Sequence, residues 1–365
     1  MDLAKGVDKE SFDVFVAAPK GWAQAQVKSQ KLKVKSYKLN GEGREEKIRE
    51  LREILRQIKE QGYPFAPIIL HAHNPLAVYL ASQAIEGLGI HLVYTEHLWT
   101  NDYHLKNWLR EKLQIAGLRN ALRQSSKVIA VSRAVSLFLT KNHIVPKDKV
   151  EVIYPIINQK SKVESYKVKS KISHSSGPIS KTTRIGSIGA LNPVKGYKYL
   201  IEAGKILLDQ GVDFRIEIIG SGPELDHLQD LAESRGLKDR VEFIGFVESK
   251  QLTNYYTVWD IYVQPSLSES FGLAVHEALL RGLPVVVSRT GGLPEQVENG
   301  ENGILVKPAE AEALADALKL IAEDGKMRRS LASDSVKIMK IPEFDGELNL
   351  NKINNLYREV VGNAK

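Results

Sequence analysis

The chain has 365 residues, of which 43% are hydrophobic and 26% are charged, and its formal net charge is +7 at pH 7. Its length exceeds the size at which one core usually divides, so we expect two domains. The sequence contains no cysteine, which excludes disulfides, thiolate metal sites and cysteine nucleophiles.

The positive charge favours an anionic partner, such as a nucleotide diphosphate or a lipid headgroup. No nucleic-acid-binding motif is present, so nucleic acid is the least favoured partner. The first residues do not resemble a signal peptide, and no apolar run reaches membrane-spanning length. We therefore expect a cytoplasmic protein.

Strand and helix patterns alternate through residues 1–157, the predicted first domain. Apolar runs predict strands at 12–19, 32–39, 67–73, 91–97 and 128–132. Helical periodicity predicts helices at 41–62, 76–88, 104–124 and 134–141. Such alternation predicts an α/β domain with a parallel, doubly wound sheet.

Two histidines share one face of the predicted strand at 67–73. They are His71 and His73, and alternation along a strand puts their rings on the same side. This spacing can bind a metal ion. No cysteine and no nearby Asp/His set completes such a site, so a metal site is the less favoured interpretation.

The predicted helix at 104–124 mixes basic and apolar residues. A basic amphipathic helix can lie on an anionic membrane, here at its inner face. The commoner interpretation is a domain helix with a basic face toward solvent. Its basic residues are Lys106, Arg110, Lys112, Arg119 and Arg123.

The pattern breaks after residue 157. Residues 158–183 are rich in lysine and serine and carry no helix caps, which predicts an interdomain linker. A second domain is predicted at 184–340, with strands at 184–191, 214–220 and 241–247. A separate C-terminal segment, 341–365, ends in a predicted helix.

The most informative stretch is 264–306. A polar loop follows an apolar strand, and a helix is predicted from Phe271 or Gly272 to Arg281. A buried strand at 284–288 then leads into the glycine loop Thr290-Gly291-Gly292 and a second short helix. Two helix amino termini, near Ser270 and Gly292, would point unpaired N–H groups into one crevice at the carboxyl ends of parallel strands. A phosphate fits there best.

Two glutamates flank this crevice. Glu269 lies in the loop and Glu277 two turns into the predicted helix. A carboxylate repels a phosphate, so both glutamates are better suited to accept hydrogen bonds from neutral hydroxyls. Phosphate together with hydroxyls indicates a nucleotide sugar. A surface loop with a solvated glutamate pair is the less favoured alternative.

A lysine loop precedes this block in the second domain. Gly189 lies near the end of the strand predicted at 184–191, and Lys195 stands just before Gly196 at a helix start. That geometry suits an ammonium beside a diphosphate. A solvated loop lysine is the alternative. The turn Gly220-Ser221-Gly222 follows the next strand and has the size of a phosphate-binding turn.

The block beginning at Glu269 reads ESFGLAVHEA, and Gly282-Leu-Pro-Val285 and Gly291-Gly292 follow it. It resembles the donor-site signature of the family 4 (group 1) retaining glycosyltransferases, which have two Rossmann-like domains facing across a cleft, the GT-B fold. The resemblance implies that Glu269 contacts the hydroxyls of the donor sugar and Glu277 those of the ribose. The turn lying against sugar and diphosphate would comprise Ser270, Phe271, Gly272 and Leu273.

The resemblance implies that the C-terminal helix within 341–365 crosses back onto the first domain, and it implies further roles outside this block. Lys195 would stabilise the leaving diphosphate, and His97 would face the donor sugar. Donor-side backbone would come from Gly189, Gly222 and Val247. It implies no metal and no cofactor beyond the nucleoside diphosphate sugar, and a hydroxyl acceptor on a glycan or lipid-linked precursor, as in cell-surface polysaccharide synthesis.

Two departures from the family pattern leave alternatives open. The pattern normally starts with a strand and a Gly-Gly loop before the element at 12–19, and we expect this chain to lack them. Ala190 stands where the family has an arginine. A catalytically weak nucleotide-sugar-binding scaffold therefore stays an alternative. Another is a different GT-B enzyme such as a nucleotide-sugar 2-epimerase, which the Glu269–Glu277 spacing disfavours.

Overall fold

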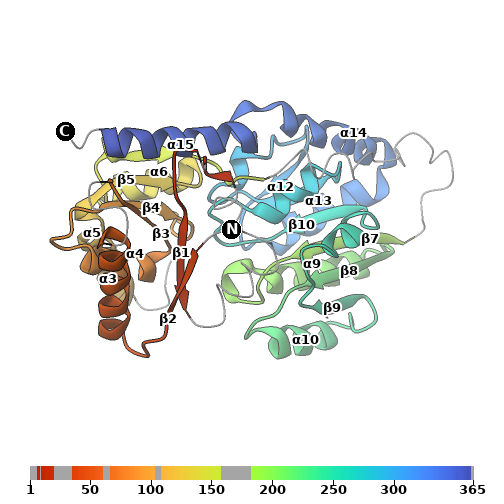
Figure 1. Cartoon of the computed structure of the whole chain (residues 1–365). Helices are drawn as coiled ribbons and strands as arrows, with labels where there is room; N and C mark the ends of the chain where they lie inside the picture. The colour runs from red at the N-terminus through yellow and green to blue at the C-terminus, as the bar shows by residue number, and fades with distance from the viewer. Residues whose placement is uncertain are drawn as a thin grey trace. The chain divides into compact units, whose positions relative to one another are not determined.

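The computed structural model describes residues 6–8, 10–19, 35–60, 66–102, 108–157 and 182–362. The chain divides into two compact units, and Figure 1 labels most of their helices and strands. Unit 1 comprises Met1–Trp99, His104–Ile157 and Glu343–Lys365, and unit 2 comprises Thr100–Tyr103 and Asn158–Pro342. Most of the predicted linker, residues 158–181, lies outside the described residues.

Unit 1 is built around a parallel sheet with the strand order β3-β4-β5-β6. Its strands are β3 (Ile69–His73), β4 (His91–Glu96), β5 (Ser125–Ala130) and β6 (Val150–Val152). Its connecting helices are α4 (Pro75–Ala84), α5 (Trp108–Ala121) and α6 (Arg133–Lys141). The helix α15 (Gly346–Gly362) contributes Ile353, Leu356 and Tyr357 to the same core as Val93 and Ile129.

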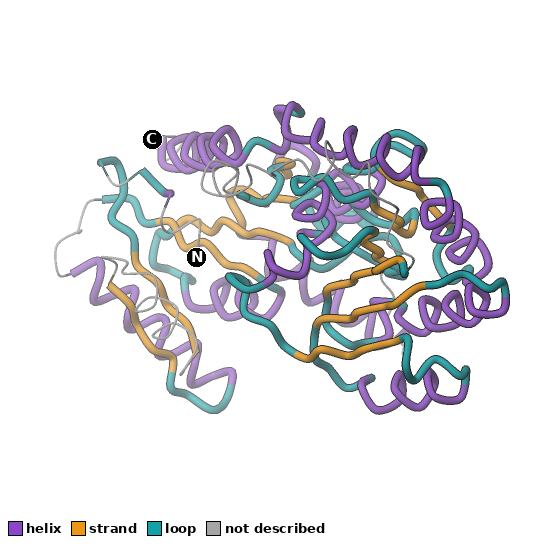
Figure 2. Tube along the Cα trace, turned by 90° about the vertical axis from the view of Figure 1, so that its right-hand side faces the viewer, coloured by secondary structure: helices purple, strands orange, loops and turns teal. Residues whose placement is uncertain are grey.

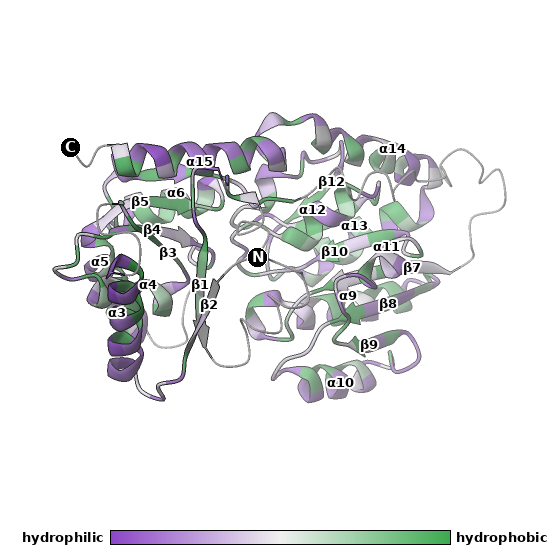
Figure 3. Ribbon diagram, in the orientation of Figure 1, coloured by the Kyte–Doolittle hydropathy of each residue, from purple (hydrophilic) through white to green (hydrophobic). Residues whose placement is uncertain are grey.

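A second, two-stranded parallel sheet belongs to unit 1. It pairs β1 (Phe15–Pro19) with β2 (Lys35–Leu39), and α3 (Arg44–Glu60) follows. The sequence predicts these strands in one sheet with β3 to β6, but among the described residues the two sheets share no ladder. The helix α3 buries Leu51, Leu55 and Ile58 and is otherwise largely hydrophilic (Figure 3).

Unit 2 contains a six-stranded parallel sheet with the order β12-β11-β10-β7-β8-β9. The strands are β7 (Thr183–Ile188), β8 (Phe214–Ile219), β9 (Val241–Gly245), β10 (Ile261–Gln264), β11 (Val285–Ser288) and β12 (Gly303–Val306). Read from β9, this is the Rossmann order, in which the direction of winding reverses between β7 and β10. Ligands bind such sheets at that switch point, beyond the carboxyl ends of the strands.

Helices cover the sheet of unit 2, and Figure 2 shows the strands running side by side among them. The helix α9 (Tyr197–Asp209) packs against α10 (Leu225–Ser234) and α13 (Ala311–Glu323), while α12 (Leu273–Leu279) packs on β10 and β11. The remaining helices are α11 (Leu252–Tyr256) and α14 (Gly325–Ser335). Parallel strands alternating with helices in both units confirm the predicted α/β fold class.

Two helices follow β12 and are separated by a single residue. Asp324 ends α13 and caps α14, because its Oδ1 accepts hydrogen bonds of 2.9 Å from the N–H groups of both Lys326 and Met327. The short 3₁₀ segments are η1 (Leu122–Gln124), η2 (Lys147–Lys149), η3 (Pro193–Lys195), η4 (Leu293–Glu295), η5 (Val336–Lys340) and η6 (Pro342–Phe344).

Candidate functional site

Two loops meet at the switch point of unit 2, one after β7 and one after β10. Asn192 caps η3 by accepting the N–H of Lys195 at 3.2 Å, and Leu267 N–H donates to Val194 O at 2.8 Å. Gly196 has a φ of +67°, and a Cβ there would lie 2.1 Å from Pro265 O. Only glycine therefore lets the two loops pack this closely.

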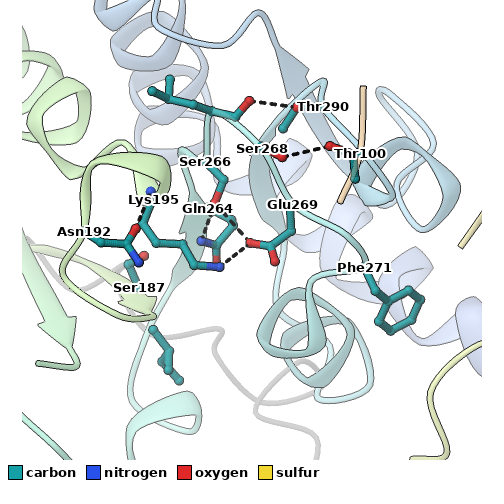
Figure 4. Close-up of polar contacts among 12 residues, drawn as sticks. Thr100, Ser187, Asn192, Lys195, Gln264, Ser266, Ser268, Glu269, Phe271 and Thr290 are labelled. Atoms are coloured by element: carbon teal, nitrogen blue, oxygen red, sulfur yellow. Dashed lines mark hydrogen bonds and ion pairs between the residues drawn. The ribbon is translucent and has the colours of Figure 1, made fainter. Parts of the chain in front are cut away.

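This packing brings Lys195 and Glu269 together. Lys195 Nζ lies 2.6 Å from Glu269 Oε2, and the two side chains are 23% and 12% exposed. They are 74 positions apart in the sequence. Figure 4 shows the ammonium reaching across to the carboxylate from the opposite loop. Two of the predicted catalytic residues thus form one ion pair.

A chain of buried polar groups holds the same carboxylate oxygen. Ser266 Oγ donates to Glu269 Oε2 at 3.1 Å, and Gln264 Nε2 donates to Ser266 Oγ at 2.9 Å (Figure 4). Tyr262 Oη donates to Gln264 Oε1 at 2.8 Å, and the N–H of Ile188 donates to Tyr262 Oη at 3.3 Å. Burial raises the pKa of the Tyr262 phenol well above its usual value, which keeps it a neutral donor.

The relay fixes one oxygen of Glu269 and leaves the other available. Within the described part of the chain, no group donates to Glu269 Oε1. Sequence analysis missed this relay. A signal for it exists, because Tyr262, Gln264 and Ser266 stand at every second position, which puts polar groups on one side of an apolar strand.

The glycine loop after β11 has another role than the one predicted. Gly292 N–H donates to the carbonyl of Glu269 at 2.9 Å, and a Cβ on Gly291 would lie 1.8 Å from that oxygen. Asp102 Oδ2 accepts the N–H of Gly291 at 2.9 Å and the hydroxyl of Thr290 at 3.1 Å. The prediction of a phosphate at these amides is therefore wrong, since both amides are occupied by groups of the chain itself.

The helix after Glu269 starts later than predicted. Gly272 has a φ of +89°, and α12 begins at Leu273. Glu277 is consequently its fifth residue, about one turn into the helix instead of two. Phe271 is buried, contacts His276 and points away from the Glu269 carboxylate (Figure 4). Its ring is thus unavailable to a ligand, and Phe271 can meet one only through its backbone.

Glu277 lies beside a buried cation. Arg281 Nη1 donates to Glu277 O at 2.6 Å and lies 3.9 Å from Glu277 Oε2. The Arg281 guanidinium stacks 4.3 Å from the centroid of the Tyr256 ring. The Glu277 side chain is 19% exposed, so its carboxylate keeps access to solvent and to a ligand.

The remaining predicted residues of unit 2 follow the strands at the same end of the sheet. A Cβ on Gly189 would lie 2.8 Å from Tyr197 Oη, and one on Gly222 would lie 2.3 Å from Leu191 O, so close packing requires both glycines. Ser270 and Val247 are half-buried, whereas Leu273 is 53% exposed. Ala190, next to Gly189, is exposed.

His97, the third predicted catalytic residue, belongs to unit 1 and directly follows β4. Its Nε2 lies 3.2 Å from His73 Nδ1. Among the described residues, no group of three or more His, Asp and Glu side chains is placed to hold a metal ion, and this includes His71 and His73. No helix in the same residues combines the length and apolar character needed to cross a bilayer.

Comparison with known proteins places these observations in a family. Residues 168–337 match the family described as glycosyl transferases group 1, and residues 1–160 match glycosyltransferase family 4. An uncharacterized glycosyltransferase from Methanocaldococcus jannaschii is 33% identical over 216 residues, which are 59% of this chain and 55% of the relative. The D-inositol 3-phosphate glycosyltransferase of Corynebacterium glutamicum is 33% identical over 188 residues, 50% of this chain and 44% of the relative. The chain spans about half the length of these curated relatives.

Solved structures of similar fold cover nearly the whole chain. Anabaena HepE in complex with UDP-glucose has a TM-score of 0.75 at 22% identity, covering 99% of this chain and 95% of that one. Sucrose-phosphate synthase from Thermosynechococcus elongatus has a TM-score of 0.73 at 22% identity, covering 90% and 84%. These likenesses confirm the predicted GT-B fold.

Proposed function

The chain belongs to the group 1, or family 4, glycosyltransferases, and from that premise we propose that it moves a sugar from a nucleoside diphosphate sugar to a hydroxyl group of an acceptor. The observation that carries the proposal is the ion pair of Lys195 with Glu269 at the switch point of unit 2. It joins a cation suited to a diphosphate and a carboxylate suited to sugar hydroxyls at the place where this fold binds ligands.

Lys195 and Glu269 would bind different parts of the donor. An ammonium has three N–H donors, and one of them serves Glu269, so Lys195 can also donate to a diphosphate oxygen. Glu269 Oε1 would accept from a hydroxyl of the donor sugar. Glu277 would accept from the ribose hydroxyls.

We propose that the transfer proceeds with retention of configuration and without a metal ion. The bond from the anomeric carbon to the diphosphate oxygen breaks while the acceptor oxygen bonds to that carbon on the same face. The acceptor proton passes to the departing phosphate oxygen. The protein then contributes positioning and electrostatic stabilisation of the diphosphate. In unit 2, Lys195 would supply the positive charge that faces the leaving diphosphate.

The proposed acceptor is a hydroxyl on a glycan or a lipid-linked precursor, as in polysaccharide synthesis at the cell surface. Names of similar proteins suggest the first compounds to try. HepE was solved with UDP-glucose, and the Corynebacterium relative is named for inositol 3-phosphate.

The test is an incubation with UDP-, GDP- and ADP-sugars and a set of hydroxyl acceptors, with products followed by mass spectrometry. Each reaction is run with and without EDTA. Transfer that persists in EDTA and yields the retained anomer supports the proposal. An inverted product, or loss of activity that Mg²⁺ restores, contradicts it.

A nucleotide-sugar-binding scaffold is the second candidate, and Ala190 favours it. This residue is exposed at the end of β7, where the resemblance leads us to expect an arginine. One charge-assisted donor is then absent from the diphosphate side of the site. Saturable binding of a nucleotide sugar without any transfer would favour the binding scaffold over the transferase.

We also propose peripheral contact with an anionic membrane through α5, at the cytoplasmic face. Trp108 is 67% exposed and Leu113 is 65% exposed, while the helix buries only Leu118 and Ala121. The same helix carries exposed basic side chains, such as that of Arg119. These apolar and basic side chains are mixed around α5 and not divided between two faces, so the contact would depend on exposed aromatic and basic groups together and not on an amphipathic face.

Sedimentation with vesicles tests the membrane contact. We expect binding to phosphatidylglycerol vesicles, weaker binding to phosphatidylcholine vesicles, and loss of binding in the Trp108→Ser/Leu113→Ser double variant. Equal recovery of wild type and double variant with anionic vesicles would refute it and leave the basic face as a solvated surface.

A further inference from the structure

Three histidines form a row at the carboxyl ends of β3 and β4 in unit 1. His71 and His73 stack with their ring centroids 4.2 Å apart and an interplanar angle of 24°. His73 and His97 stack at 5.5 Å and 30°, and His73 Nδ1 lies 3.2 Å from His97 Nε2. The row thus leads from the partly buried His71 to His97, the residue that the family resemblance assigns to the donor sugar.

The inner end of the row is fixed at both ring nitrogens. His71 Nε2 lies 2.7 Å from Thr95 Oγ1, and His71 Nδ1 is hydrogen-bonded to Tyr357 Oη on α15. Tyr357 also packs edge-on against the His71 ring. A ring bound at both nitrogens cannot rotate without breaking a hydrogen bond, so it provides a rigid surface for His73 to stack on.

The backbone that carries His97 is also fixed. Glu96 is fully buried, and its Oε1 accepts the N–H groups of Leu98 at 2.7 Å and Trp99 at 3.2 Å. Tyr94 Oη donates to the other oxygen of Glu96 at 2.8 Å. The backbone of the turn after β4 is therefore held by the buried Glu96 side chain. The orientation of the His97 ring is not determined by these contacts.

All three imidazoles favour the neutral form. Desolvation lowers the pKa of His71 well below its usual value, and desolvation together with His97 lowers the pKa of His73 to about 4. Desolvation also lowers the pKa of His97. A neutral imidazole carries one N–H, on either nitrogen. A contact between His73 Nδ1 and His97 Nε2 therefore contains one donor and one acceptor.

We propose that His73 is a positioning residue that holds His97 in one tautomer and one ring orientation through the hydrogen bond between His73 Nδ1 and His97 Nε2. If His73 donates, His97 carries its proton on Nδ1 and presents a donor. If His97 donates, it presents an acceptor at Nδ1. In either case the free nitrogen of His97 has a defined character for a hydroxyl of the substrate. The pairing stands on the contacts within unit 1, and its effect on catalysis rests on the proposed function.

Two substitutions separate hydrogen bonding from packing. His73→Asn keeps a hydrogen-bonding group close to the place of Nδ1, whereas His73→Phe keeps an aromatic ring but no nitrogen. The ring nitrogens of His97 are observed by ¹H–¹⁵N NMR on the full chain, with His97→Asn to assign the signals. We expect one tautomer in the wild type and in His73→Asn, and tautomeric averaging in His73→Phe. Unchanged His97 signals in His73→Phe would overturn the inference.

Kinetics then test the consequence. We expect His73→Phe to lower kcat/KM for the donor roughly tenfold, the loss of about one hydrogen bond, and His73→Asn to recover most of it. The exposed His227 of α10 gives a matched control, since His227→Phe should leave both measurements unchanged. Equal activity in His73→Phe together with an altered tautomer would refute the assigned role of His97 in transfer and leave the pairing intact.

Discussion

Lys195 Nζ and Glu269 Oε2 lie 2.6 Å apart across the two loops that follow β7 and β10. The pair is partly buried, and Ser266 donates to the same oxygen at 3.1 Å. The carboxylate is therefore oriented by two donors at one oxygen, and its second oxygen keeps its capacity to accept. An arrangement of this kind pre-organises a site for a ligand that carries both hydroxyls and phosphate.

Removal of the Lys195 ammonium should lower turnover. We expect Lys195→Ala to reduce kcat about 10²–10³-fold, as the loss of one donor to a developing oxyanion does in other enzymes. Steady-state kinetics with a saturating nucleotide sugar measure the effect. Lys198→Ala removes an exposed lysine three positions away and serves as the control. Similar kcat values for both variants would exclude Lys195 from the reaction.

Gln264 links two buried hydroxyls, and its loss should destabilise unit 2. In Gln264→Leu, Tyr262 Oη keeps only the longer 3.4 Å contact with Ile188 O as an acceptor, and Ser266 Oγ loses a donor. We expect a decrease of about 1–3 kcal/mol in the free energy of unfolding, because each buried hydroxyl loses a short hydrogen bond that no water can replace. Urea unfolding measures it, with Gln251→Leu at an exposed position as the control. Equal stability of the two variants would show that the relay contributes nothing to folding.

Glu277 should select for ribose hydroxyls. We expect Glu277→Ala to weaken binding of the nucleoside diphosphate by about 1–3 kcal/mol through loss of a hydrogen-bond acceptor. Calorimetry with ribo- and 2′,3′-dideoxynucleotides makes the assignment specific. The wild type should prefer the ribonucleotide, and the variant should bind both forms equally. A variant that still discriminates between them would place the ribose elsewhere.

The sequence predicts the parts of this site that depend on strand order and misses those that depend on distant partners. Apolar runs identify the strands ending at Ile188 and Gln264, and the Rossmann pattern predicts that their following loops meet. Nothing local indicates that Asp102, far away in the chain, occupies the N–H of Gly291. A free glycine amide and one bound to a carboxylate look identical in the sequence.

The start of α12 shows a similar limit. The sequence permits a helix from Phe271 onward, but Gly272 has a φ of +89°. A Cβ added to Gly272 would lie only 2.5 Å from Leu293 Cδ2. The backbone can take this conformation only because the residue is glycine. Helix propensity alone does not reveal it, so the helix was expected to begin one or two residues earlier than it does.

Unit 1 should lose stability in acid through its histidine row. The pKa of His73 is lowered to about 4 in the folded chain, against about 6.5 in an unfolded one. Between these values the unfolded chain binds more protons, so the stabilisation is complete above pH 6.5 and falls as the pH decreases toward 4. The imidazole of His73 is packed between the rings of His71 and His97, but the residue as a whole remains exposed to solvent, so we expect a contribution on the order of only 1 kcal/mol.

Urea unfolding at pH 7, 6, 5 and 4 checks this dependence. The His73→Asn variant should lose less stability between pH 6.5 and 4 than the wild type, whereas His227→Asn should follow the wild type. Parallel curves for all three proteins would mean that the His73 ring titrates as an ordinary exposed histidine.

Arginine at position 190 should strengthen binding of the donor. Ala190 is exposed at the end of β7, and Gly189 before it packs on Tyr197 Oη without a side chain of its own. An arginine there has room to extend, and its planar fork matches two phosphate oxygens. We expect Ala190→Arg to tighten binding of the nucleoside diphosphate by roughly 1.5–3 kcal/mol, the contribution of one charge-assisted hydrogen bond.

Ala190→Gln, which is long and polar but uncharged, is the matched control. If the chain is a transferase, turnover should rise with affinity, whereas a scaffold would gain affinity alone. An unchanged or weaker affinity in Ala190→Arg would show that residue 190 does not face the diphosphate.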